Sequence, residues 1–258
     1  MICILVLLCA LFPGLALAGE PDAEFWKAYA LSYPQTAIKA VTAPLEWETG
    51  NWLTAGGVVL VTGILYSYDE ELRDLFQRNR TDWGDGVMTG FKQFGEGKYV
   101  LPAIGATVLG AWLAGSDKTM DTGLLCLKSY LLANGVTQGL KFSTQRLRPE
   151  AEQGKEFWNS SSLSFDRSFP SGHTTIVWSV APILAHQYKD SGWVGPTVYT
   201  IGALTSYSRL NDNRHWASDV FFGAVVGYVT ARLVLEDTPR LAVAPDPALK
   251  GISVRYEF

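Results

Sequence analysis

Residues 141–219 carry three short polar clusters, around which the rest of the chain is organised. The first reads Lys-Phe-Ser-Thr-Gln-Arg-Leu-Arg-Pro (residues 141–149) and the second reads Pro-Ser-Gly-His (residues 170–173). The third reads Ser-Arg-Leu-Asn-Asp-Asn-Arg-His-Trp-Ala-Ser-Asp (residues 208–219). Each cluster lies at the edge of a long apolar segment, and two of the chain's three histidines fall inside them. We interpret the three clusters as parts of one polar site.

The rest of the chain is dominated by apolar segments with helical periodicity. These segments span about residues 52–68, 99–115, 121–141, 172–188, 193–207 and 216–235. The pattern predicts an all-α bundle of about six core helices. The first segment is expected to continue as helix through its acidic end to Arg78. After Thr238 apolar and polar residues alternate, which predicts a small C-terminal β-hairpin packed on the helices.

The start of the chain predicts export. Residues 1–18 are apolar and close on Ala16-Leu-Ala18, a small-x-small cleavage pattern, so we expect a signal peptide. Four regions follow from this reading: 1–18 signal peptide, 19–50 amphipathic N-terminal region, 51–236 helical domain, and 237–258 hairpin tail. We expect the exported domain to be periplasmic or membrane-associated, with its site outside the cytoplasm. The apolar segments are at or below the ~20 residues that cross a bilayer, so a multi-span membrane protein is the alternative.

Composition limits the partners. The 258 residues include only 18% charged side chains and carry a formal net charge of −4. This balance gives no bulk attraction to nucleic acid, so none is expected as a partner. The basic residues that matter are local, and the oligomeric state is not indicated.

Three cations come from different segments: Lys141, Arg148 and Arg209. Arginine can bind two oxygens of a phosphate at once, and lysine acts as a point charge. A phosphate ester is a dianion, and its hydrolysis depends on positioning and on stabilising charge at its oxygens. The three cations therefore indicate a phosphate site.

The second cluster opens a helix. A helix N-terminus presents free N–H groups and a positive dipole end, which suits an anion. Gly172 lets the backbone approach closely, Ser171 adds a hydroxyl, and His173 would stand beside the anion, placed to protonate a leaving oxygen.

The third cluster offers a nucleophile. His215 and Asp219 are four residues apart and would share a helix face. A carboxylate at that spacing can hold one imidazole nitrogen and leave the other free to attack phosphorus. Hydrolysis would then proceed through a phosphohistidine, and neither step requires a metal.

The clusters also have alternative interpretations, most of them purely structural. Pro-Ser-Gly-His can be a plain helix start, and His215 with Asp219 can be a structural pair. His173, His215 and Asp219 could ligate zinc, but the neighbouring cations oppose this. Arg146, Asp212 and Arg214 are interpreted as loop charges, with Arg214 able to touch a substrate. 

The three clusters together resemble the type-2 phosphatidic acid phosphatase / vanadium haloperoxidase superfamily. Its pattern is Lys-x6-Arg-Pro, Pro-Ser-Gly-His and Ser-Arg-x5-His-x3-Asp, which this chain fills without substitution. The resemblance covers about residues 50–235. It implies His173 as general acid, His215 as nucleophile and Asp219 as the partner that orients it. It also implies five phosphate-binding residues: Lys141, Arg148, Ser171, Gly172 and Arg209.

Two kinds of enzyme fit this resemblance. The first is a metal-independent phosphatase without a cofactor, acting on lipid or prenyl phosphates or, alternatively, on small soluble phosphomonoesters as a broad acid phosphatase. Vanadate would inhibit such an enzyme. The second is a haloperoxidase in which the same cations hold vanadate as cofactor and His215 ligates it. A non-catalytic anion-binding or membrane-scaffold protein is the third hypothesis.

Overall fold

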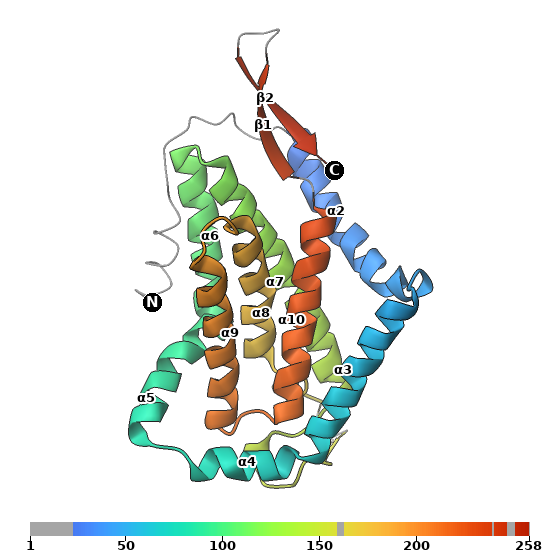
Figure 1. The fold of residues 1–258 in the computed structure, drawn as a ribbon, viewed down its shortest axis with the longest axis vertical. Coiled ribbons are helices and arrows are strands. Elements are labelled where there is room, and N and C mark those ends of the chain that lie inside the picture. Colours follow the sequence, from blue (N-terminus) through green and yellow to red (C-terminus); the bar gives the residue numbers. More distant parts are fainter. Residues whose placement is uncertain (1–22, 159–162, 239, 247–250, 258) are drawn as a thin grey trace.

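A computed structural model describes residues 23–158, 163–238, 240–246 and 251–257. The predicted signal peptide of residues 1–18 lies outside the described residues. Helices dominate the described part of the chain, as predicted (Figure 1). The α-helices are α2 (Ala23–Thr42), α3 (Thr49–Ser67), α4 (Asp69–Arg78), α5 (Asp82–Phe91), α6 (Gly97–Ala114), α7 (Asp117–Thr144), α8 (Gly172–Gln187), α9 (Val194–Asn211) and α10 (Ala217–Asp237). Three short 3-10 helices are η1 (Ala43–Leu45), η2 (Lys92–Gly95) and η3 (Pro149–Ala151).

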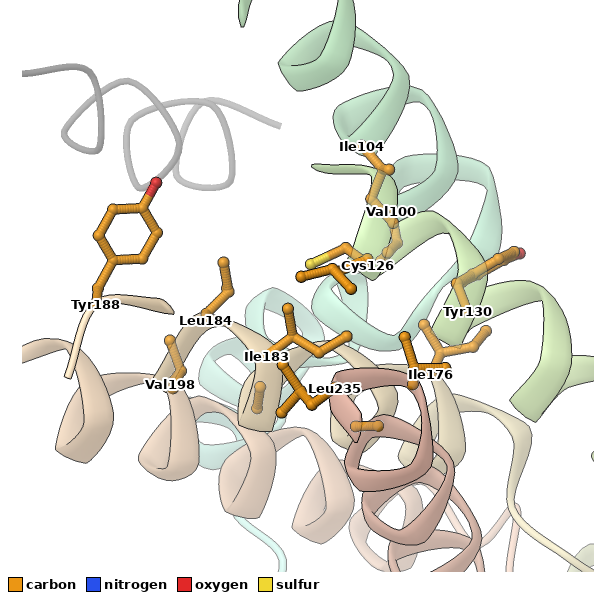
Figure 2. Packing of buried hydrophobic residues seen from close by; sticks show 14 of the residues in the cluster. Val100, Ile104, Cys126, Tyr130, Ile176, Ile183, Leu184, Tyr188, Val198 and Leu235 are labelled. Atoms are coloured by element: carbon orange, nitrogen blue, oxygen red, sulfur yellow. The ribbon is translucent and has the colours of Figure 1, made fainter. Parts of the chain in front are cut away.

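The core of the bundle lies between α6, α7, α8, α9 and α10. Figure 2 shows their apolar side chains meeting around Ile183, which is fully buried. Burying such side chains is the main force that packs the helices together. Gly227 allows α10 to approach α8 closely, because a Cβ there would come within 2.4 Å of the carbonyl oxygen of Thr175. The six predicted apolar segments correspond to α3 and α6–α10.

The chain turns sharply after the first apolar segment. The predicted continuous helix to Arg78 is wrong, since α3 ends at Ser67 and α4 begins at Asp69. Tyr68 makes the break with φ −100° and ψ 10°, outside the helical range. Figure 1 shows α4 lying across the end of the bundle where α8 and α10 begin. The turn therefore carries Asp69 to the end that holds the polar clusters.

Apolar side chains cover much of the outside of the bundle. No residue of α3 is buried, although the helix carries no charge. By length and composition α6 and α10 are apolar enough to cross a membrane. Such a surface indicates association with a membrane. The exposed large apolar residues of α3 and α6 include Trp52, Leu53, Val59, Leu60, Val61, Ile64, Leu101, Leu109, Trp112 and Leu113.

The described backbone ends in two antiparallel strands, β1 (Arg240–Asp246) and β2 (Gly251–Glu257). Val243 pairs with Val254 in this register. The connecting residues 247–250 and all side chains of the tail lie outside the described part. Packing of the predicted hairpin on the helices therefore stays a prediction.

Candidate active site

The antiparallel order of the helices brings the three clusters to one end of the bundle (Figure 1). Lys141 lies in the last turn of α7, and Arg209 lies in the last turn of α9. His173 and Asp219 lie in the first turns of α8 and α10. Ends of neighbouring antiparallel helices meet at the same level, so residues 78 positions apart become neighbours.

A polar cavity of about 490 Å³ opens at this end. Its walls carry Arg148, His173 and Arg209 from the predicted site. The remaining lining residues are also polar: Arg80, Lys92, Glu96, Asp166, Asp212 and Arg214. Arg214, interpreted from the sequence as a loop charge able to touch a substrate, is one of these lining residues. Cations outnumber carboxylates along the wall, so the cavity suits an anion.

The predicted cations have partners within the protein, but in the described part of the chain not every N–H donor among them is used. Arg148 pairs with the exposed Asp166, and Arg209 pairs with Asp212. The buried Nε of Arg148 has no hydrogen-bond partner within the described residues. A buried N–H without an acceptor costs free energy, which a phosphate oxygen would recover. Lys141 donates to the carbonyl of Arg167, and burial lowers the pKa of Lys141 to about 8.

The start of α8 lies beside Lys141 and presents backbone N–H groups there. The Ser171 N–H is used, since it donates to the carbonyl of Asp219 at 3.0 Å. Ser171 is buried, and its Oγ accepts from Thr174 at 3.0 Å. A Cβ on Gly172 would meet Lys141 Cε at 3.8 Å, so the glycine backbone lies beside that cation. The first-turn N–H groups that follow Ser171 are the ones that face an anion.

His215 is held by a backbone carbonyl. Its Nδ1 lies 2.8 Å from the carbonyl oxygen of Ser168, which can only accept, so Nδ1 carries the proton. The lone pair is therefore on Nε2. Because α10 begins at Ala217, His215 precedes the helix, and the expected shared helix face is wrong. Asp219 Oδ2 is 3.8 Å from Nδ1, beyond hydrogen-bond length.

Asp219 instead contacts residues that surround His215. Its Oδ2 accepts from the Trp216 N–H at 2.9 Å and from the hydroxyl of Ser168, the residue whose carbonyl holds the imidazole. Its Oδ1 accepts from Arg146 Nη1 at 2.5 Å. Asp219 is fully buried. Its link to His215 runs through Ser168, which sequence spacing did not indicate.

Both histidines are neutral in this site. Burial lowers the pKa of His215 to about 3, and Lys141 and Arg148 act in the same direction while Asp219 opposes them. Burial, followed by the charge of Arg209, lowers the pKa of His173 to about 2. A neutral His215 is the form that can attack phosphorus.

Glu96 is a site residue that the sequence did not single out. Its carboxylate lies 4.0 Å from His173 Nε2 and faces the polar cavity. Gly95 brings η2 this close, because a Cβ there would lie 2.5 Å from the carbonyl oxygen of His173. Arg146, interpreted from the sequence as a loop charge, does lie between α7 and η3, but its side chain is fully buried. Among the described residues, no three His, Cys, Asp or Glu side chains come together as a metal site.

The fold and the cavity define a helical bundle with a cavity at one end that is lined mainly by cations. The model of the PAP2 superfamily matches residues 122–241. The structure of a transmembrane PAP2-type phosphatidylglycerolphosphate phosphatase from Bacillus subtilis superposes with a TM-score of 0.56 and 27% identity. The alignment covers 70% of this chain and 93% of that chain. Over residues 122–241 the chain is similar to the PAP2 superfamily, and its fold resembles that of a solved member.

Curated relatives agree with this similarity. A lipid A 1-phosphatase from Porphyromonas gingivalis is 35% identical over 103 residues, covering 40% of this chain but only 20% of that protein. Phosphatidylglycerophosphatase B of Bacillus subtilis is 29% identical over 181 residues, which cover 67% of this chain and 84% of the relative. LpxE of Aquifex aeolicus, at 23% identity and a TM-score of 0.51 over 65% of this chain and 94% of that one, shares the fold.

Proposed function

We propose that the protein is a metal-independent phosphatase that hydrolyses lipid phosphate monoesters through a phosphohistidine at His215. One observation carries the proposal. The Nδ1–H of His215 is fixed on the Ser168 carbonyl at 2.8 Å, which leaves the Nε2 lone pair available. The cation-lined cavity and the similarity to the PAP2 superfamily support the same reaction.

In the first step, Nε2 of His215 forms a bond to phosphorus while the ester P–O bond breaks. Arg148, Arg209 and Lys141 stabilise the charge on the other phosphate oxygens. His173 protonates the departing oxygen. Burial and the positive charge of Arg209 lower the pKa of His173, and a bound phosphate dianion would offset the charge of Arg209 and raise that pKa.

In the second step, water attacks the phosphohistidine. His173, now neutral, takes a proton from the water as the new P–O bond forms. The P–N bond breaks, inorganic phosphate leaves, and His215 returns to its starting form. No metal or cofactor is needed, and vanadate, as a phosphate analogue, is expected to inhibit.

An apolar groove beside the site supports a lipid substrate over a soluble one. It lies between α6, α8 and α9 and is lined by Phe94, Val100, Ala103, Ile104, Val177, Val180, Ala181, Leu184, Val198 and Ile201. Residues three, four or seven apart share a helix face. His173 therefore stands at the end of the stripe that continues to Val177 and Leu184, and Arg209 ends the stripe that contains Ile201.

The groove fits one hydrocarbon chain. Eleven residues separate His173 from Leu184, which is about 16 Å along a helix. The groove is open along one side, so a chain would lie along it with one face exposed. The phosphate would remain in the polar cavity, with the chain leaving it toward the apolar flank. The names of the relatives, lipid A 1-phosphatase and phosphatidylglycerophosphatase B, agree with this class of substrate.

We also propose that the bundle lies in a membrane, with lipid against the uncharged face of α3 and the exposed side of α6. We propose that the site faces the periplasm, the side that the sequence predicts for an exported domain. Labelling of a Gln153→Cys variant with a membrane-impermeant thiol reagent in intact cells tests the side. Gln153 is exposed in the loop after Arg148. Labelling only after the inner membrane is opened would place the site in the cytoplasm.

A broad acid phosphatase acting on soluble phosphomonoesters is the second candidate. An acid phosphatase of Zymomonas mobilis is 42% identical over 59 residues, which cover 23% of this chain and 21% of that protein. The polar cavity alone would serve such substrates. The groove distinguishes the two candidates, because only a lipid substrate would use it.

Phosphate release in EDTA tests the proposal. Purified wild type is expected to hydrolyse phosphatidic acid faster than an aryl phosphate, and His215→Gln is expected to lose activity by at least about 1,000-fold. His186→Gln is the matched control, since His186 lies in the last turn of α8, away from the site. No release from either substrate, with bromide oxidation in vanadate and peroxide, would select the haloperoxidase.

Filling the groove tests the substrate class. Ala103→Phe should lower kcat/KM for phosphatidic acid about tenfold, because it places a ring where the chain would lie, and should leave the aryl phosphate unaffected. Ala106→Phe, on the exposed side of α6, is the control. Equal loss on both substrates, or no loss on either, would favour the soluble-substrate candidate.

A further inference from the structure

A chain of three fully buried charges lies beneath the site. Asp69, Arg146 and Asp219 each have no exposed surface. Arg146 Nη2 donates to Asp69 Oδ2 at 2.8 Å, and its Nη1 donates to Asp219 Oδ1 at 2.5 Å. The three residues come from α4, the segment after α7, and α10. One guanidinium therefore joins three parts of the chain.

Every N–H of this guanidinium is used. Nη1 also donates to the Ser218 hydroxyl at 2.8 Å, and both Nε and Nη2 donate to the Lys155 carbonyl at 3.3 Å. Its central carbon lies 4.9 Å from the ring centres of Tyr66 and Trp158 and 5.5 Å from that of Trp216. The rings exclude water, so the charges act in a low dielectric and hold one geometry.

Asp69 binds Ser218 at the start of α10 as well as Arg146. Its Oδ1 accepts from the Ser218 N–H at 3.0 Å, and its Oδ2 accepts from the Ser218 hydroxyl at 2.6 Å. These bonds fix the start of α10, where Asp219 follows directly. Asp69 also lies outside residues 122–241, the part that the family model matches.

Two short paths lead from Arg146 to His215. Through its side chain, Arg146 holds Asp219, which accepts from the hydroxyl of Ser168. Through its backbone, the Arg146 carbonyl accepts from the Ser168 N–H at 2.9 Å. Both paths end on Ser168, whose carbonyl holds Nδ1 of His215.

The charge of the group also matters to the reaction. Two carboxylates and one guanidinium sum to one negative charge on the Nδ1 side of His215. When Nε2 bonds to phosphorus, the imidazole becomes cationic, and this negative charge stabilises it. Without Asp69, Arg146 and Asp219 would cancel and the imidazolium would lose that support.

We propose that Asp69 and Arg146 are positioning residues for His215: they fix Ser168 and Asp219 and supply the negative charge that stabilises the phosphorylated imidazole. The inference rests on the proposed function. It assigns part of the reaction to α4, a helix that approaches the site only because the chain breaks at Tyr68.

The test is Asp69→Asn, which keeps the size of the side chain and removes its charge. We expect kcat for phosphatidic acid to fall about 100-fold with KM little changed, since the loss is in orientation and not in phosphate binding. The acidic limb of the kcat profile should move to lower pH, because a less stabilised imidazolium has a lower pKa. Asp74→Asn, an exposed carboxylate of the same helix, is the matched control.

A second readout does not depend on activity. Nitrogen NMR of 15N-histidine-labelled protein, assigned with His215→Gln, reports which ring nitrogen of His215 carries the proton. Wild type and Asp74→Asn should show a single form protonated at Nδ1, and Asp69→Asn and Arg146→Lys should show a mixture. Lysine keeps the charge of Arg146 but cannot bridge two carboxylates.

Two outcomes would overturn the inference. One is a folded Asp69→Asn protein with the wild-type His215 spectrum and an unmoved pH profile. The other is a fall in kcat that, in both Asp69→Asn and Arg146→Lys, is fully explained by a smaller fraction of folded protein. Wild type without phosphatase activity but with the expected NMR changes would refute the proposed function and leave the positioning of His215 intact.

Discussion

Arg146 and Lys128 are both fully buried cations, but they lie at opposite ends of α10 and are treated differently. Arg146 bridges two carboxylates beside the start of that helix. Lys128 donates to two hydroxyls beyond its end, those of Ser32 and Thr238, each at 2.9 Å. The buried cation at the site end is thus paired with carboxylates of distant segments, and the buried cation at the far end with hydroxyls. The buried carboxylates and their guanidinium therefore lie at the end of the bundle where we propose that the reaction takes place.

Replacing Arg146 by methionine should have the largest effect. Arg146→Met leaves Asp69 and Asp219 buried without their partner, which should destabilise the fold by about 3–5 kcal/mol and abolish phosphate release. Thermal unfolding in detergent, together with the phosphatase assay, measures both effects. Stability within 1 kcal/mol of wild type would contradict the view that this bridge holds the site together.

Lowering the pH should decrease the free energy of unfolding through His215, at the site end. Burial keeps His215 neutral with a pKa of about 3, while the unfolded chain titrates near 6.5. Between these values the unfolded chain binds a proton that the folded chain does not, so stability falls as pH falls from 6.5 toward 3. His215→Gln should lower this slope by up to about 1.4 kcal/mol per pH unit. An unchanged slope in His215→Gln would show that His215 is not held neutral.

The smallest effect is expected at the far end. In Lys128→Met, the hydroxyls of Ser32 and Thr238 keep their bonds to the carbonyls of Tyr29 and Val234, each at 2.7 Å. An apolar side chain of similar size removes the cost of burying a charge, so stability should change by about 1 kcal/mol or less. Activity should be unchanged, since Lys128 lies about 20 Å along α7 from Lys141. A loss as large as that of Arg146→Met would remove the contrast between the two ends.

The helices and the principal site residues could be predicted from the sequence. Apolar periodicity located α3 and α6–α10 because packing of an apolar face determines where helices form. The three polar clusters predicted a shared site, and the antiparallel helices bring Arg148, His173 and Arg209 into one cavity. The roles of the eight predicted site residues remain proposals.

The connections between side chains could not be predicted. The spacing of His215 and Asp219 suggested a direct pair, but α10 begins between them, and Ser168 takes the position of the acceptor. In the sequence, nothing distinguishes Arg146 from other loop arginines, because its partner Asp69 is distant along the chain. The contact depends on the helix break at Tyr68, which no glycine or proline marks. Pairing across such distances is decided by tertiary packing.

The most direct test of the account is to trap the intermediate. Protein mixed with 32P-labelled phosphatidic acid and quenched in alkali should carry an acid-labile, alkali-stable label, the behaviour of a phosphohistidine. We expect this label on His215 in wild type and His186→Gln, and none in His215→Gln. Rapid phosphate release without any label, or a label that persists in His215→Gln, would contradict the account.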